Sequence, residues 1–311
     1  MKLNVNPVIR GMIAANAIGL LLVAISKWII DYTERNRLPD VGGIFVFSDF
    51  IIVPVLMGVT CAFFWRNSQL TGKQYTWNAV ICGLYGILLS AIVLREGVIC
   101  LIIVSPLIFG FIIGGVSIGR YLFKKKNNTL NVSFVSILFL FLVSDSLSVH
   151  TYDNMVADVV TIKASPEQVW KYVDAYEPIK EKPSFWLFRV GMPYPVQSTV
   201  DGHYKGAGRK CVFSNGYVFD EVMSVYDQNK ELTFDITHQP RDPEIMGHID
   251  ILKGQFILKD NGDGTTTLTG NSWYRLYIAP VWYYDIWASS ITRNVHLRVM
   301  EHIKYLAEHE Q

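Results

Sequence analysis

The stretch Val160–Val173, VTIKASPEQVWKYV, decides how the second half of the chain folds. It begins as an alternating strand and continues into a sequence that is typical of a helix start. Ser165 would cap the helix, Pro166 fits the first helical position, and Gln168 follows the cap at the spacing of a capping box. The stretch therefore predicts the first strand and the first helix of a water-soluble domain.

The residues before this stretch have a different composition. Residues 1–150 contain 12 Lys/Arg and 6 Asp/Glu, whereas residues 151–311 contain 16 Lys/Arg and 21 Asp/Glu. A basic, apolar half followed by an acidic, aromatic-rich half predicts a transmembrane helical domain at 1–150 and a water-facing domain at 151–311. The second half has no basic stripe that could neutralise phosphates, so the composition argues against a nucleic-acid partner.

Five apolar runs in the first half are candidate membrane spans, each of which needs about 20 mostly apolar residues. Four of them are Val8–Ile30, Ile44–Trp65, Trp77–Leu94 and Gly97–Phe123. The fifth, 129–149, has an apolar core of only 12 residues, Val132–Val143, so an interfacial or re-entrant segment is the alternative to a crossing. The first run has no small-x-small cleavage site before Asp31 and is predicted to be a retained span rather than a signal peptide.

The distribution of Lys and Arg predicts the orientation of these spans. With the N-terminus inside and five spans, eight Lys/Arg fall on inner segments and four on outer segments, and Lys124–Lys126 is the strongest inner marker. Positive charge concentrates on the cytoplasmic side of membrane proteins. The sequence thus predicts an integral protein of a plasma membrane, such as a bacterial inner membrane, with a cytoplasmic N-terminus and an extracytoplasmic C-terminal domain.

The ionisable residues and the glycine pairs in the predicted spans each allow two interpretations. Lys27, Asp49 and Asp145 would lie near the outer ends of their spans, where they either form a small polar cluster or extend to the interface. The pairs Gly110-x3-Gly114 and Gly115-x3-Gly119 either permit close helix packing or reflect the general frequency of glycine in membrane helices.

The cysteines and histidines predict no metal centre. Cys61, Cys82 and Cys100 lie in apolar runs, and Cys211 is alone in the second half. No Cys/His cluster has the spacing of metal ligands, and no cofactor-binding motif accompanies them, so we expect neither a metal nor a cofactor.

The second half reads as short strands closed by a long helix. Asn215-Gly216 is a strong hairpin signal, and Asn261–Gly264 marks a later turn. An unbroken helical pattern runs from about Val281 to Glu308. The order is one strand, one or more helices, a run of antiparallel strands and a long final helix.

This order, together with four groups of residues, resembles a known superfamily. The groups are Ile162-x-Ala164-Ser165-Pro166-Glu167-x-Val169-Trp170, Gly206-x-Gly208, Glu221-Val222 followed by Glu231-Leu232-Thr233-Phe234, and Gly264–Thr269. Over residues 155–308 the chain resembles the START-like, or SRPBCC, superfamily, which includes polyketide cyclase/dehydrase-like proteins. The resemblance implies a helix-grip fold, in which a curved antiparallel sheet surrounds the C-terminal helix and leaves an apolar cavity.

Strand alternation predicts which side chains face that cavity. On the strand that ends near Tyr226, the apolar set of Tyr217, Phe219, Met223 and Val225 shares a face with Glu221. The full set of predicted ligand-binding residues is Tyr217, Phe219, Glu221, Met223, Phe234, Ile236, His238, Phe256, Tyr274, Trp287 and Ile291. Glu221 and His238 are candidate acid–base residues. Alternatively, Glu221 pairs with Arg209 or Lys210 across the sheet, and His238 is exposed at a strand end.

Aromatic side chains gather in two further segments, Phe185–Phe188 and Val281–Trp287. They are equally compatible with a cavity mouth, a belt on the bilayer and well-packed helix starts; exposure of both would favour a membrane- or ligand-facing surface.

The sequence therefore supports three functions. The first is binding of a hydrophobic or lipid-like small molecule by a membrane-tethered helix-grip domain, because tethering raises its access to a ligand that is scarce in water. The second is a cyclase, dehydratase or hydrolase type of enzyme that acts on a lipid-like substrate through Glu221 and His238. The third is a non-catalytic sensory or interaction module.

Overall fold

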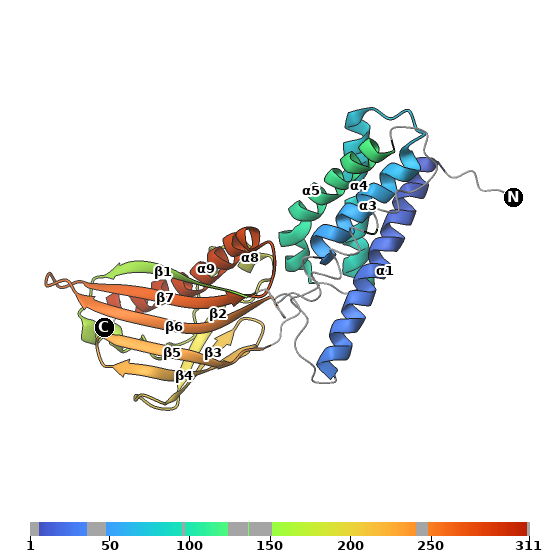
Figure 1. Ribbon diagram of the computed structural model, residues 1–311. Helices are drawn as coiled ribbons and strands as arrows, with labels where there is room; N and C mark the ends of the chain where they lie inside the picture. The colour runs from blue at the N-terminus through green and yellow to red at the C-terminus, as the bar shows by residue number, and fades with distance from the viewer. Residues whose placement is uncertain are drawn as a thin grey trace. The chain divides into compact units, whose positions relative to one another are not determined.

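The computed structural model describes residues 6–35, 48–94, 97–123, 151–240 and 248–309, together with Ser136 (Figure 1). The chain divides into two compact units. One consists of Met1–His150, Pro243–His248 and Tyr277–Pro280, and the other is built from Thr151–Asp242, Ile249–Leu276 and Val281–Gln311.

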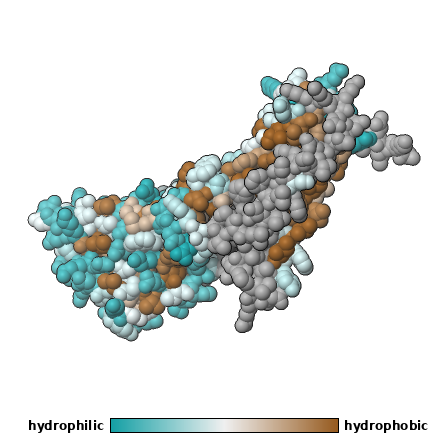
Figure 2. Space-filling model, viewed as in Figure 1, coloured by the Kyte–Doolittle hydropathy of each residue, from teal (hydrophilic) through white to brown (hydrophobic). Residues whose placement is uncertain are grey.

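The N-terminal unit is helical. Its elements are α1 (Pro7–Arg35), the π-helical turn η1 (Ser48–Ile52), α3 (Val53–Trp65), α4 (Gly72–Leu89), the π-helical turn η2 (Ser90–Leu94) and α5 (Val98–Leu122). Three segments, Pro7–Ile29, Gly72–Val93 and Val98–Leu122, are long and apolar enough to cross a membrane. Figure 2 shows hydrophobic side chains gathered along the visible surface of these helices.

The five predicted spans are therefore matched only in part. The second predicted run corresponds to a shorter apolar helix, Asp49–Trp65. The fifth run, 129–149, lies outside the described residues, as does Asp145. The count of five spans and the orientation of the chain stay predictions.

Small residues bring α3 and α5 into backbone contact. A Cβ on Gly115 would lie 2.3 Å from the carbonyl oxygen of Val55, and a Cβ on Gly119 would lie 2.5 Å from Cβ of Ala62. Nothing lies within 4 Å of the corresponding positions at Gly110 and Gly114. Of the two predicted glycine pairs, Gly115/Gly119 thus lies at the helix contact.

Polar groups inside this unit are few. Asp49 accepts a hydrogen bond of 3.0 Å from Ser26 Oγ of α1, while Lys27 on the same helix is half-buried. Asn16 donates through Nδ2 to the carbonyl of Met12 at 2.9 Å and towards Cys82.

The C-terminal unit is a seven-stranded antiparallel sheet with the order β1-β7-β6-β5-β4-β3-β2. Its strands are β1 (Tyr152–Ile162), β2 (Pro195–Val200), β3 (Gly208–Phe213), β4 (Val218–Asp227), β5 (Glu231–His238), β6 (Ile249–Asp260) and β7 (Thr266–Leu276). The short helices α7 (Pro166–Trp170) and α8 (Trp186–Arg189) join β1 to β2, and α9 (Val281–Glu308) follows β7. Figure 1 shows α9 running along one face of the sheet.

The helix start that opens the domain has the predicted geometry. Ser165 Oγ accepts a hydrogen bond from the amide of Gln168, and the Gln168 side chain accepts one from the amide of Ser165. Val169 and Trp170 of this helix are buried in the core. The capping box thus starts α7, which is only five residues long and is stabilised mainly by that packing.

The C-terminal part of α9 fills the concave face of the sheet. Val299, Met300 and Ile303 belong to one core cluster with residues of β1, β4, β5, β6 and β7. The approach is close, because a Cβ on Gly270 of β7 would lie 2.5 Å from Sδ of Met300.

Hydrogen bonds also hold α9 against the edge of the sheet. His296 Nε2 lies 2.7 Å from the carboxylate of Asp158 on β1, and its Nδ1 lies 3.1 Å from Ser272 Oγ on β7. Arg293 Nε lies 3.0 Å from the same Asp158 oxygen. A neutral imidazole satisfies both contacts, because Nε2–H donates to Asp158 and Nδ1 accepts from the Ser272 hydroxyl.

We predict that Gly115→Ala destabilises the helical unit by about 1–3 kcal/mol, because the new methyl group overlaps the α3 backbone. Gly114→Ala is the matched control, since its methyl group meets open space. Thermal unfolding of the full chain in detergent micelles measures both; equal stability of the two variants would contradict the packing role of Gly115.

We predict that His296 makes the free energy of unfolding depend on pH. Burial lowers the pKa of His296 below its ordinary value of 6.5, against the opposing effect of Asp158. The unfolded chain then binds the proton more readily than the folded chain, so stability falls as the pH drops below about 6.5. The pKa of His302 is lowered in the same direction, first by burial, so His296→Gln should reduce this slope without abolishing it. Unfolding titrations at several pH values test this, and identical slopes would refute it.

Candidate functional site

The structure places most of the predicted cavity residues inside the helix-grip domain. Phe219, Glu221, Met223, Phe234, Phe256 and Tyr274 are buried. Tyr217, Ile236, Trp287 and Ile291 are half-buried. His238 is exposed at the end of β5, and no hydrogen bond joins it to Glu221. The two candidate acid–base residues are therefore not brought together.

Simple alternation fails in the second half of β4. The pairing of β4 with β5 shifts between Met223 and Val225, as a β-bulge requires. Val225, which alternation placed on the inner face, is 38% exposed. Tyr226 takes the inward position and contacts Trp170 of α7.

The centre of the site is a buried ion pair. Glu221 of β4 lies opposite Arg209 of β3 in the sheet register, and its Oε2 accepts a hydrogen bond from Nη1 of Arg209. The two residues are 5% and 3% exposed. Burial raises the pKa of the Glu221 carboxyl, and Arg209 opposes this rise.

The surroundings of this pair are aromatic and weakly polar. The guanidinium of Arg209 lies 4.4 Å from the centre of the Phe234 ring, and its Nε donates to the carbonyl oxygen of Asp174 at 2.9 Å. Tyr176 Oη lies 3.9 Å from Cys211 Sγ. Burial raises the pKa of the Cys211 thiol to about 12, so this cysteine stays protonated and is a poor nucleophile.

The ion pair keeps unused hydrogen-bonding capacity. Among the residues that the structure describes, none bonds to Nη2 of Arg209 or to Oε1 of Glu221. A charged group in an apolar interior is costly unless its hydrogen bonds are made. The pair thus keeps N–H donors on Nη2 of Arg209 and an acceptor on Oε1 of Glu221 that no described residue binds.

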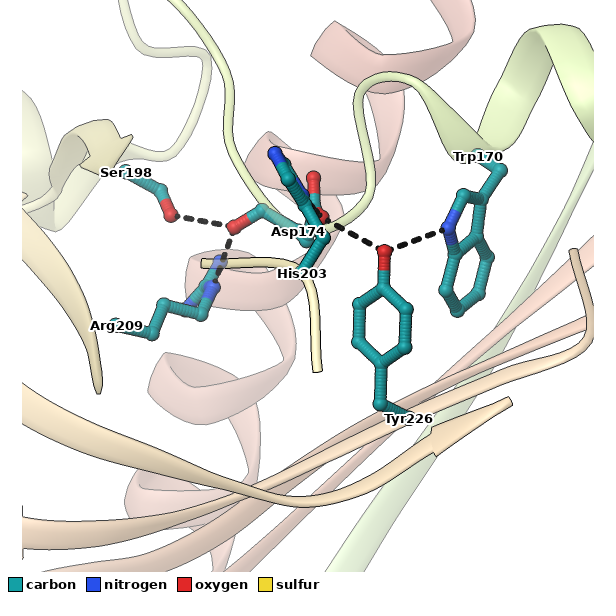
Figure 3. Close-up of polar contacts among 6 residues, drawn as sticks. All are labelled: Trp170, Asp174, Ser198, His203, Arg209 and Tyr226. Atoms are coloured by element: carbon teal, nitrogen blue, oxygen red, sulfur yellow. Dashed lines mark hydrogen bonds and ion pairs between the residues drawn. The ribbon is translucent and has the colours of Figure 1, made fainter. Parts of the chain in front are cut away.

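A second set of polar contacts connects the ion pair to solvent through Asp174 (Figure 3). Its Oδ2 lies 2.6 Å from His203 Nδ1 and accepts from Tyr226 Oη at 3.3 Å. Its main-chain oxygen, which binds Arg209, also accepts from Ser198 Oγ at 3.1 Å. The Asp174 side chain is 5% exposed and that of His203 is 68% exposed.

Sequence reasoning missed Asp174 and Tyr226 and gave Arg209 only as a partner for Glu221. Asp174 lies in a loop, where no periodicity indicates the direction of a side chain. Arg209 is the residue that a pattern could have found, because Arg209, Cys211 and Phe213 alternate along β3 on one face.

Glu221 and His238 do not form a proton-transfer pair, because Glu221 is bonded to Arg209 and His238 is exposed at the end of β5. Within the described ranges, no three His, Cys, Asp or Glu side chains are grouped as metal ligands.

The N-terminal unit contains a small cavity of about 60 Å³. Asn16, Asp49 and Gly86 are among its lining residues, and Oδ1 of Asn16 is buried there without a partner among the described atoms. A volume of this size holds only a few water molecules. The cavity is therefore suited to water molecules that bind its polar lining residues, Asn16 and Asp49.

We predict that Glu221→Gln destabilises the domain by about 3–5 kcal/mol, because it leaves the Arg209 charge buried without a counter-ion. The control is Asp220→Asn, the neighbouring residue, whose 3.7 Å contact with Lys210 is 44–58% exposed and should contribute less than about 1 kcal/mol. Denaturant unfolding of the full chain in micelles compares the two. Equal losses would show that the buried pair has no special role.

Neither the comparison with family models nor that with curated proteins finds a match. Among solved structures, norcoclaurine synthase from Thalictrum flavum is 11% identical, with 53% of this chain and 99% of that chain covered and a TM-score of 0.37.

Two further solved structures are similar over the same half. A START superfamily protein from Mycobacterium smegmatis is 13% identical, covering 49% of this chain and 98% of that chain, with a TM-score of 0.34. The ZhuI aromatase/cyclase from Streptomyces sp. R1128 is 12% identical, with 50% of this chain and 94% of that chain covered and a TM-score of 0.36. The strand order, the two short helices after β1 and the long α9 match the helix-grip arrangement that the sequence predicts for this half of the chain.

Proposed function

We propose that the helix-grip domain binds an apolar or amphiphilic small molecule and that the N-terminal helices hold the domain at a membrane. The observation that carries this proposal is the buried Arg209–Glu221 pair with its unused donor and acceptor. Ligand sites are mostly apolar and contain a small number of polar groups that orient the ligand. Phe219, Phe234 and Ile236 would supply the apolar walls around this pair.

The charges of the pair suggest what kind of polar group it receives. Arg209 and Glu221 together are neutral, and they present N–H donors on Nη2 of Arg209 and a carboxylate acceptor on Oε1 of Glu221. A neutral group with both a donor and an acceptor, such as a hydroxyl or a primary amide, satisfies both atoms. An ionised carboxylate would bind Arg209 but would be repelled by Glu221.

The membrane part of the proposal is supported by both units. Three helices of the N-terminal unit are long and apolar enough to span. In the C-terminal unit, Trp186, Trp282 and Ile286 are 46%, 68% and 62% exposed. Tryptophan is common at membrane–water interfaces because its ring is both apolar and polar. Tyr152, the first residue of β1, pairs with Leu276 shortly before α9, so these aromatic side chains lie near the point where the chain enters the domain.

Binding is tested with oleamide, an amphiphile with a neutral amide, on the full chain in detergent micelles. At about 100 times its Kd, a ligand stabilises the folded state by about 2.7 kcal/mol. We predict that oleamide raises the unfolding temperature more than oleate does. Native mass spectrometry of the purified protein would detect co-purifying ligands.

Matched variants locate the binding. Ile236→Trp places a large ring beside Glu221, its register partner, and should abolish the oleamide effect. Thr237→Trp adds the same ring to the exposed face of the strand and should not. If oleamide stabilises neither the wild type nor the control, the binding proposal fails and a non-catalytic interaction module becomes the better reading.

A further inference from the structure

A basic pocket lies at one end of the helical bundle, between the end of α3, the start of α4 and the end of α5. Its volume is about 460 Å³, and its polar lining consists of Arg66, Tyr75, Ser117, Arg120 and Tyr121. Sites for small molecules typically measure about 300–1,000 Å³. All of the lining residues belong to the N-terminal unit, so the pocket is independent of the helix-grip site.

Aromatic rings hold both guanidinium groups in place. Arg66 lies 4.0 Å from the centre of the Phe63 ring and donates through Nη1 to the Phe63 carbonyl at 2.6 Å. Arg120 lies 4.2 Å from the centre of the Tyr75 ring. Tyr75 is itself buried, and its hydroxyl donates to the carbonyl of Trp65 at 3.1 Å. Stacking through the faces leaves the N–H groups at the edges available.

Neither arginine is neutralised by the described part of the chain. No described carboxylate forms an ion pair with Arg66 or Arg120, and Arg120 makes no hydrogen bond to a described residue. Asp49, an acidic residue of this unit whose side chain the structure describes, lies in η1 and accepts a hydrogen bond from Ser26 instead. Arg66 and Arg120 thus have no counter-charge among the described residues.

The start of α4 adds to the positive potential. Gly72 is the first residue of this 18-residue helix, and a Cβ at Gly72 would lie 3.9 Å from Nη1 of Arg120. Helix N-termini carry partial positive charge and favour anions. No acidic side chain occupies the first turn.

We propose that this pocket binds a phosphate-bearing anion, either the headgroup of an anionic phospholipid or free phosphate. Guanidinium groups bind phosphate oxygens through paired, charge-assisted hydrogen bonds. Arg66 and Arg120 would bind the phosphate from two sides of the pocket, and Ser117, whose hydroxyl donates to the carbonyl of Ile113 at 2.9 Å, would form part of the wall. This proposal does not depend on ligand binding by the helix-grip domain.

Two probes distinguish the sources of phosphate. The full chain is placed in nanodiscs of phosphatidylcholine with and without phosphatidylglycerol, and native mass spectrometry counts the lipids that it retains. In a second arm, inorganic phosphate is added to the protein in micelles at constant ionic strength, with chloride as the reference, and the unfolding temperature is measured. Wild-type protein should retain phosphatidylglycerol in preference to phosphatidylcholine; if it binds free phosphate instead, only the second arm should respond.

The variants separate the pocket from general electrostatics. Arg66→Gln and Arg120→Gln should each weaken binding about tenfold or more, as expected for loss of a hydrogen-bonded charge. Lys73→Gln removes one charge at the same end outside the lining and should have little effect. Ser117→Trp fills the pocket without changing its charge and should also abolish binding. This variant tests the pocket even if the arginine variants misfold. No preference for either probe, or an effect of Lys73→Gln equal to that of the arginine variants, would overturn the proposal.

Discussion

The helix-grip domain depends on the burial of α9 against the sheet. Met300 and Ile303 are fully buried, and the helix approaches β7 so closely that only glycine fits at position 270 without displacing Met300. Such close contact excludes water, so hydrogen bonds between polar groups at the interface stabilise the packing. His296 finds Asp158 and Ser272, and Asp285 accepts hydrogen bonds from Tyr274 at 2.6 Å and Asn154 at 2.9 Å. Apolar packing thus supplies the stability, and these hydrogen bonds select one orientation of the helix.

The same exclusion of water determines the free-energy cost of burying the Arg209–Glu221 pair. Two charges in a dry interior cost more than an apolar pair of similar size, unless hydrogen bonds satisfy them. Asp174 and Phe234 stabilise Arg209 in part, yet one atom of each charged group remains without a bond to the described residues. A pair kept only for stability would be easier to replace by hydrophobic side chains. Under our proposal, a ligand completes the hydrogen bonds of the pair.

Local signals in the sequence predicted the outline of this domain well. The capping box at Ser165 and the hairpin at Asn215-Gly216 depend on neighbouring residues alone, and the structure has both, with Gly216 at a φ of 86°. The interior of the site depends on register, which local patterns do not define. Alternation along β3 separates Arg209 from Lys210, but only the register with β4 brings Arg209 opposite Glu221. The bulge after Met223 likewise exchanges Val225 for Tyr226 on the inner face.

The basic end of the bundle shows a similar limit. Counting Lys and Arg treats Arg66 and Arg120 as two equal contributions to the orientation of the chain. The structure distinguishes them from freely solvated cations such as Lys73, because each guanidinium is stacked on a ring and faces a shared pocket. Orientation and anion binding are not competing roles, since both follow from the same positive potential at one end of the helices. A charge that only oriented the chain would need no fixed position, whereas Arg120 is held by Tyr75, and Tyr75 in turn by the backbone of Trp65. That chain of contacts orders a side chain with high conformational entropy, and a bound anion is the partner that would make this ordering favourable.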